Sequence, residues 1–206
     1  MKRLNGMDAM LLYSETPNLH THTLKVAILD ASGYAGEDGA PYGFEAFRRT
    51  VARRLHLLDP LRYRLVDIPW HLHHPMWLPD CPVDLDYHLR RVRVPGPGGR
   101  RELDRVIGEI ASTPLDRSKP LWEMWVIEGL GGSAADEGGD VVLMIKVHHA
   151  AVDGVSAANL LDKLCDIEPN AATPEPVDGP GAVPAWAIAA DGLWRFVTLP
   201  WQLTRA

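Results

Sequence analysis

Residues 141–147, Val-Val-Leu-Met-Ile-Lys-Val, form a nearly continuous apolar run that constrains the fold more than any other feature of the sequence. A short run of this kind is typical of a strand buried inside a sheet. Two histidines, His148 and His149, follow directly, and an Asp-Gly pair then precedes a predicted helix over 155–165. The sequence therefore predicts a buried strand that delivers polar side chains into a loop, which is a common way to build an active site.

The rest of the chain alternates between strand and helix patterns. Runs rich in apolar and aromatic residues predict strands over 23–29, 63–68, 87–94 and 122–128. Apolar residues spaced along one face predict helices over 7–14, 44–57 and 101–111, with Asn5 as the cap of the first. Strands 122–128 and 141–147 are expected to pair across the loop 129–140. With helices on one side of the strands, the expected class is α/β, a two-layer sandwich of a mixed sheet flanked by helices.

Composition divides the chain into three segments. Residues 1–168 are predicted to form one domain, since 46% hydrophobic and 23% charged residues are ordinary for a folded chain. Residues 169–184 are predicted to be a linker, because prolines stand at 169, 174, 176, 180 and 184. Residues 185–206 are predicted to form an amphipathic helical segment. Its apolar face needs further protein or a membrane interface to cover it.

Charge and cysteine content narrow the partners and the compartment. A net charge of −6 argues against nucleic acid as a partner. Two widely separated cysteines give no disulfide framework, which is consistent with a reducing cytoplasm. The sequence lacks the pattern of a secretory signal, and no apolar run reaches membrane-spanning length. Any membrane contact is therefore expected to be peripheral.

Several kinds of chemistry could use the adjacent histidines. Both could be structural, with satisfied nitrogens, which is the commoner fate of a histidine pair. A shared metal is disfavoured because neighbouring residues on a strand point to opposite faces, and no Cys lies nearby. A nucleophile is disfavoured because Ser156 fails the Gly-x-Ser-x-Gly pattern and neither cysteine is well positioned. The pattern fits best a single histidine acting as a general base without a covalent intermediate.

A lone general base limits the substrates. It suffices when the electrophile is already activated and the leaving group departs without help. Thioesters meet both conditions, because a thiol with a pKa of about 8.5 can leave as thiolate without a dedicated general acid. Acyl transfer from a thioester is therefore the expected reaction.

Four segments together resemble one known family. Residues 148–154, His-His-Ala-Ala-Val-Asp-Gly, resemble the HHxxxDG motif of the superfamily of chloramphenicol acetyltransferase and peptide-synthetase condensation domains. Residues 3–10 resemble the opening of bacterial wax ester synthase/diacylglycerol acyltransferases. Residues 114–123 match their Pro-Leu-Asp-Arg-Ser-Arg-Pro-Leu-Trp-Glu block, with Lys119 in place of an arginine. Residues 83–90 resemble their Phe-Asp-x-x-x-His-x-Arg segment, with Val83 in place of an aromatic residue, so the likeness runs from residue 3 to about residue 168.

The resemblance implies a chloramphenicol-acetyltransferase-like fold that forms the N-terminal half of a two-domain enzyme, with the active site in a tunnel between the halves. It implies an O-acyltransferase that moves a long-chain acyl group from acyl-CoA, as substrate, to diacylglycerol or a long-chain alcohol, without a cofactor or metal. The expected location is the cytoplasm, peripherally associated with a membrane or lipid droplet. A condensation-type enzyme using carrier-protein thioesters and a non-catalytic acyl-CoA- or lipid-binding module remain the alternatives.

The resemblance also assigns roles within the motif. His149 would be the general base, and His148 would shape the site and help to position the loop. Asp153 would be mainly architectural, paired with an arginine for which Arg117 is a candidate. Gly154 would permit a tight turn and close backbone approach.

Three further features carry predictions of their own. Lys119 keeps the positive charge of the family's arginine but not its bidentate fork, so a phosphate bound there would be held more weakly. Trp122 is predicted to pack in the core. The histidines at 71, 73 and 74, between Pro69 and Pro79, are predicted to lie in an exposed or lipid-facing loop rather than at a metal.

Overall fold

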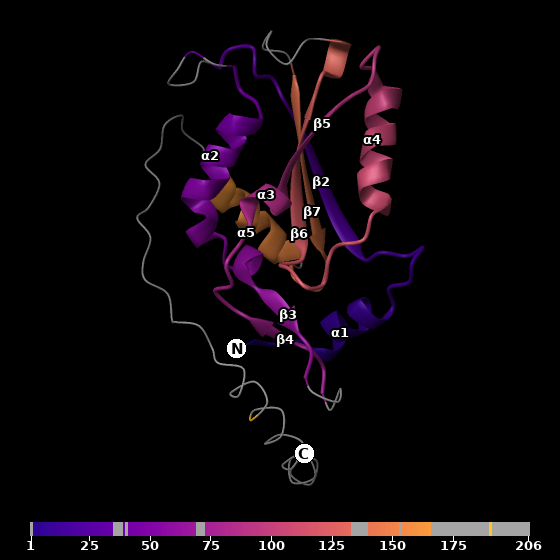
Figure 1. The fold of residues 1–206 in the computed structure, drawn as a ribbon, viewed down its shortest axis with the longest axis vertical. Helices are drawn as coiled ribbons and strands as arrows, with labels where there is room; N and C mark the ends of the chain where they lie inside the picture. Colours follow the sequence, from indigo (N-terminus) through magenta and orange to yellow (C-terminus); the bar gives the residue numbers. More distant parts are fainter. Residues whose placement is uncertain are drawn as a thin grey trace.

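A four-stranded mixed sheet forms the centre of the fold (Figure 1). The structure is a computed structural model that describes residues 2–34, 39, 41–68, 73–132, 140–152, 154–165 and 190. The sheet has the order β2 (His22–Leu29), β7 (Val141–His148), β6 (Trp122–Glu128), β5 (Leu89–Arg93). Strand β7 is antiparallel to both of its neighbours, and β5 runs parallel to β6. The predicted interior strand and its pairing with 122–128 are thus confirmed.

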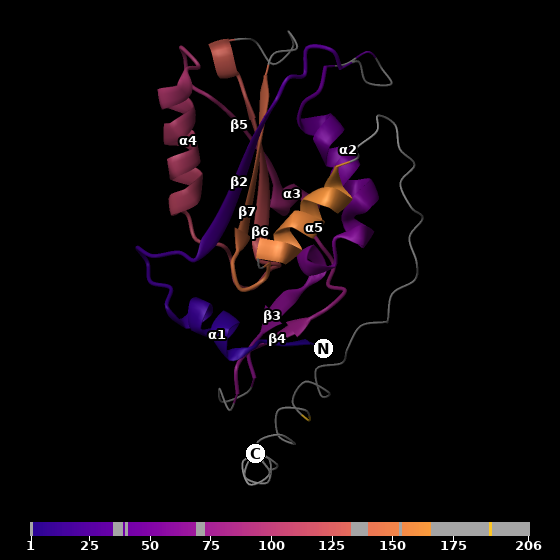
Figure 2. The same cartoon turned by 180° about the vertical axis from the view of Figure 1, so that it is seen from behind.

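Helices cover both faces of this sheet (Figures 1 and 2). Helices α2 (Phe44–Arg54) and α5 (Gly154–Leu164) lie on one face, and α4 (Arg100–Ser112) lies on the other. Side chains alternate along β7, so Ile145 packs toward α2 and α5 while Met144 packs toward α4. The predicted mixed sheet flanked by helices is confirmed, but the helices are not confined to the single face that a two-layer sandwich would have.

A smaller sheet lies beside the carboxyl end of β7 and next to α1 (Gly6–Tyr13) (Figure 1). Its order is β1 (Lys2–Arg3), β4 (Met76–Leu78), β3 (Arg64–Val66). Helix α1 begins one residue before the predicted position, and its predicted cap is confirmed, because the Oδ1 atom of Asn5 accepts a hydrogen bond of 2.8 Å from the backbone N–H of Asp8. Strand β4 was not predicted. His73 and His74 of the predicted exposed loop are half-buried and precede β4, in which Trp77 is only 4% exposed, so the exposed-loop prediction is wrong at Trp77.

Two other predicted elements change character along their length. The predicted strand 87–94 is split into α3 (Leu85–His88) and β5, because the Asp84 side chain accepts from the N–H groups of Asp86 and Tyr87 and caps a helical turn. The predicted helix 44–57 ends at Arg54 and continues as the 3₁₀ helix η1 (Leu55–Leu57). Two further 3₁₀ turns are η2 (Asp59–Arg62) and η4 (Leu130–Gly132).

Some predictions concern residues outside the described part of the chain. These are His71, residues 133–139 of the predicted loop, Asp153, the linker over 169–184 and, apart from residue 190, the helical segment over 185–206. Within the described residues, no helix combines the length and the apolar character needed to cross a membrane.

Candidate active site

The two histidines lie where β7 ends and the chain turns toward α5. The backbone N–H of His148 donates to the carbonyl of Leu121 at 3.0 Å, and that of His149 donates to the carbonyl of Thr21 at 2.9 Å. Leu121 immediately precedes β6 and Thr21 immediately precedes β2. The start of the turn is therefore fixed to the ends of both strands that flank β7.

The two side chains have opposite environments. His148 is 1% exposed, whereas His149 is exposed to solvent. No side-chain hydrogen bond of His149 is present among the described residues. The contrast agrees with the prediction that neighbouring residues at the end of a strand face different ways, and it leaves His149 as the histidine that a substrate can reach.

The hydrogen bonds of His148 define its protonation. The N–H of Ala150 donates to Nδ1 at 3.0 Å, so Nδ1 carries a lone pair and the ring proton lies on Nε2. Nε2 lies 3.0 Å from Oγ1 of Thr21 and 3.2 Å from Oε1 of Glu15. Burial lowers the pKa of His148, although the nearby Glu15 acts to raise it. His148 is therefore a neutral group locked in one tautomer.

Glu15 connects this histidine to the segment after α1. Its carboxylate accepts from the backbone N–H of Thr21 at 3.0 Å and from Arg117 at 2.8 Å, besides its contact with His148. Burial acts to raise the pKa of Glu15, but the hydrogen bonds from Arg117 and Thr21 outweigh it, and the pKa lies below its usual value. The ionised carboxylate of Glu15 thus contacts Thr21, Arg117 and His148 beside the histidine pair.

Replacing Glu15 with glutamine is expected to destabilise this network. The amide keeps one acceptor but loses the negative charge, and hydrogen bonds to charged groups contribute about 1.5–3 kcal/mol. We expect Glu15→Gln to lower the free energy of unfolding by an amount in that range in urea titrations. The matched change Glu109→Gln, at an exposed position on α4, should stay within about 0.5 kcal/mol of the parent. Equal effects of the two changes would contradict the role given to Glu15.

Arg117 contacts the segment that follows α1. One guanidinium nitrogen, NH2, donates to Glu15 and to the carbonyl of Leu12 at 2.6 Å. Its pairing with Asp153 stays a prediction, since Asp153 lies outside the described residues. Sequence reasoning missed Glu15, because two of its partners, Arg117 and His148, are more than a hundred residues away in the chain.

Lys146, the one charged residue of the apolar run, is also part of this framework. Its side chain is fully buried, and Nζ donates to the carbonyls of Ile110 and Thr113 at the end of α4. The carboxylate of Glu123 lies 3.8 Å away. Burial lowers the pKa of Lys146, and Glu123 opposes this effect. These contacts tie the carboxyl end of α4 to β7 two residues before His148.

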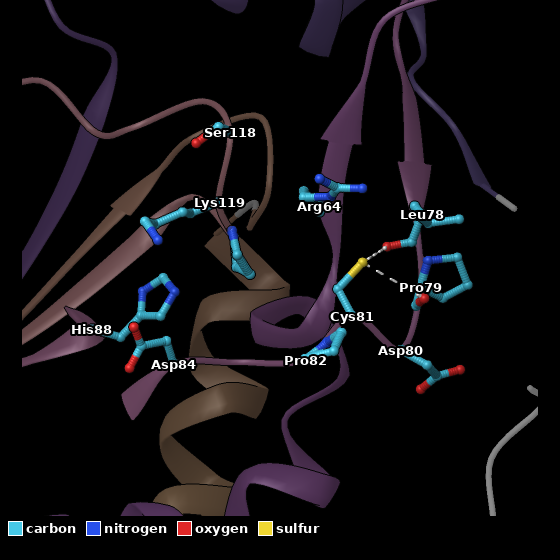
Figure 3. A pocket seen from close by; sticks show the side chains of 11 residues that line it. Arg64, Leu78, Pro79, Asp80, Cys81, Pro82, Asp84, His88, Ser118 and Lys119 are labelled. Carbon is cyan, nitrogen blue, oxygen red and sulfur yellow. Dashed lines mark hydrogen bonds between the residues drawn. The ribbon is translucent and has the colours of Figure 1, made fainter. Parts of the chain in front are cut away.

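A pocket of about 370 Å³ opens beside the strand end that anchors His148 (Figure 3). Ser118, Lys119 and Pro120 line it, immediately before Leu121. Figure 3 shows the side chains of Lys119 and Arg64 reaching the pocket from different segments, with the ring of His88 close to Lys119. The lining also includes Asp80, which is paired with Arg62, and Asp84, so the pocket presents charges of both signs, and an anionic group would be favoured on the side of Arg64 and Lys119.

His88 is a buried residue in the wall of this pocket. It is 1% exposed, its Nδ1 donates to the carbonyl of Trp122 at 2.7 Å, and its ring stacks on that of Trp122 with centroids 4.3 Å apart. Burial lowers the pKa of His88, so the ring is neutral and Nε2 keeps its lone pair. The prediction that Trp122 packs in the core is confirmed, because it is 1% exposed.

Comparison with known proteins identifies the family of this chain. The wax ester synthase/diacylglycerol acyltransferase catalytic domain family matches residues 4–204. One Mycobacterium tuberculosis protein, whose name assigns it diacylglycerol O-acyltransferase activity, is 52% identical over 169 residues, covering 82% of this chain and 34% of the relative. A second protein of that name in the same species is 45% identical over 203 residues, which cover 98% of this chain and 39% of that relative. The chain thus spans little more than a third of the length of these relatives.

Solved structures show the same fold. The wax ester synthase/diacylglycerol acyltransferase from Marinobacter aquaeolei VT8 matches with a TM-score of 0.63 and 27% identity, over 94% of this chain and 45% of that one. The first condensation domain of the CDA synthetase matches with a TM-score of 0.56 and 20% identity, over 79% of this chain and 37% of that one. At this identity the match shows a shared fold only. On these matches, the chain belongs to the wax ester synthase/diacylglycerol acyltransferase family.

Proposed function

We propose that this chain supplies the general base of an O-acyltransferase that transfers a long-chain acyl group from acyl-CoA to diacylglycerol or a long-chain alcohol. The observation that carries the proposal is the contrast within the histidine pair. His148 is buried, neutral and locked in one tautomer, whereas its neighbour His149 is exposed. A general base needs an accessible imidazole on a rigid support, and His149 has both.

In the proposed reaction, His149 accepts the proton of the acceptor hydroxyl as its oxygen attacks the thioester carbonyl. A carbon–oxygen bond forms, the carbon–sulfur bond breaks, and CoA leaves as the thiolate. The proton held by His149 then passes to the thiolate, so the base is regenerated without an acyl-enzyme intermediate. His148 does not exchange protons in this scheme, because its Nδ1 accepts from Ala150 and its Nε2 proton faces Glu15.

The pocket in Figure 3 is the proposed site for the polar part of acyl-CoA. Arg64 and Lys119 would attract its phosphates, while Nε2 of His88 would accept from an N–H or O–H group of the pantetheine arm. A lysine at position 119 gives a point charge rather than the fork of an arginine, so this contact is expected to be electrostatic and sensitive to salt.

The remaining part of the enzyme and a lipid surface are the proposed partners. The chain covers 34% of its relative from Mycobacterium tuberculosis, so the predicted tunnel between two halves needs a second half. Met7, Met10 and Tyr13 on α1 are 67%, 56% and 60% exposed. Such a group of exposed apolar side chains is suited to protein or lipid contact.

Release of CoA from palmitoyl-CoA tests the proposed function. We expect release that depends on an added acceptor, and comparison of a diacylglycerol with hexadecanol identifies which alcohol is preferred. A carrier-protein thioester used in place of palmitoyl-CoA tests the condensation-type alternative. When the second half is present, binding of palmitoyl-CoA without release in the presence of either acceptor would reject the enzyme and favour the binding module.

A further inference from the structure

A second group of histidines lies on the α4 side of the sheet, at the start of β2. His20 and His22 are two residues apart on an extended segment, so their side chains face the same way. Their rings lie nearly parallel, with centroids 5.2 Å apart and planes inclined by 13°. Glu15 reaches the same place from the loop after α1. One ligand atom from each of the three side chains lies within 4.8 Å of the other two.

The His22 ring is buried without the hydrogen bonds that burial ordinarily requires. Its side chain is 4% exposed, and Nδ1 has no hydrogen-bond partner among the described residues. Its other ring nitrogen, Nε2, is 3.8 Å from Oε1 of Glu15, beyond hydrogen-bond distance. A buried polar atom left without a partner costs about 1–3 kcal/mol. The nitrogen left without a partner therefore points to a group that the described residues do not supply.

The other two residues are held as metal ligands are held in proteins. Nε2 of His20 donates to the carbonyl of Ser112 at 3.1 Å, which leaves the lone pair on Nδ1. Glu15 is oriented through its Oε2 atom, which accepts from Arg117 at 2.8 Å. Ligating imidazoles usually donate their second N–H to a carbonyl or carboxylate, and ligating carboxylates are themselves hydrogen-bonded.

We propose that Glu15, His20 and His22 form a binding site for a divalent transition-metal ion of the zinc class. Two imidazoles and a carboxylate suit Zn²⁺ and its neighbours, whereas Mg²⁺ and Ca²⁺ prefer sites built from oxygen alone. Three protein ligands leave a fourth position for water. The ring of His22 is 6.2 Å from that of His148, and both contact Glu15, so the ion would lie one side chain away from the catalytic motif.

Calorimetric titration of the metal-free protein with Zn²⁺ tests the proposal. We expect one tight site that is weakened at least about tenfold in His20→Ala and in His22→Ala. His56→Ala, which removes a histidine of η1, is the matched control and should bind as the parent does. Because an ion that binds the folded state raises its stability, Zn²⁺ should also raise the melting temperature of the parent and of His56→Ala, and of neither site variant. Co²⁺ should give the visible absorption bands of a four-coordinate site with nitrogen and oxygen ligands.

Two outcomes would overturn the proposal. One is Zn²⁺ affinity that is unchanged in both site variants, which would place the ion on other histidines. The other is no Zn²⁺ binding by a folded parent protein. Circular dichroism of each variant shows whether it is folded, and His20→Gln keeps a polar side chain at the more accessible position. Binding is measured without turnover, so the result does not depend on the proposed acyl transfer.

Discussion

Alanine at position 149 is expected to lower acceptor-dependent release of CoA by about 100- to 10,000-fold, the usual contribution of a general base. The imidazole is the proposed proton acceptor, and alanine offers none. Since the side chain is exposed and makes no hydrogen bond among the described residues, its removal should change the free energy of unfolding by less than about 0.5 kcal/mol. Steady-state kinetics with saturating palmitoyl-CoA, together with urea unfolding, measures both quantities.

The neighbouring histidine provides the control. His148→Ala removes a buried ring that accepts from Ala150 and contacts Glu15. It should lower the free energy of unfolding by about 1–3 kcal/mol, because Glu15 loses one of its partners and the N–H of Ala150 loses its acceptor. A His149→Ala protein that retains the parent's kcat, or one that is destabilised as much as His148→Ala, would contradict the division of roles between the two side chains.

This division could be predicted from the sequence only in part. The alternation of side chains along a strand indicates that His148 and His149 face different ways, and the apolar run before them indicates a buried strand. The burial of His148 and its tautomer depend instead on Glu15, Thr21 and Ala150. Glu15 is more than 130 residues before the motif, and no local pattern indicates a contact at that separation.

For the fold, too, local patterns predicted the elements but not all of their packing. The strands 122–128 and 141–147 were predictable because each has a strong local pattern. Their pairing was predictable because a single loop, 129–140, connects them. Which face a helix covers is a tertiary property. Helix α4 packs on Val142 and Met144, and α2 packs on the opposite face, although both helices have an ordinary apolar stripe. A single apolar strand such as β7 accommodates helices on both faces, so the number of layers could not be predicted.

Local chemistry also overrode strand propensity in one place. Residues 87–94 contain the aromatic and β-branched residues of a strand, but the first of them, Tyr87, comes only three residues after Asp84. The Asp84 carboxylate accepts from two backbone N–H groups and stabilises a helical turn through His88. That turn brings the His88 ring against Trp122, which a strand beginning at 87 would not predict.

Trp122 contacts three segments that are far apart in the sequence. It is 1% exposed, and its indole Nε1–H donates to the carbonyl of the fully buried Leu61 at 2.8 Å. Its ring stacks on His88, and its backbone pairs with Val147 in the register of β6 and β7. The same residue thereby holds η2, α3 and the strand that carries the histidine pair.

Alanine at position 122 is therefore expected to lower the free energy of unfolding by about 3–5 kcal/mol, the cost of truncating a buried tryptophan. It would leave a cavity and deprive the carbonyl of Leu61 of its donor. Trp125→Ala, on the same strand, is the matched control and should cost less, because Trp125 is only half-buried and its truncation leaves a smaller cavity. Urea unfolding of both variants measures the difference. Equal losses would mean that Trp122 is one core side chain among many, whereas a larger loss at 122 would support its role in joining η2, α3 and the pair of strands β6 and β7.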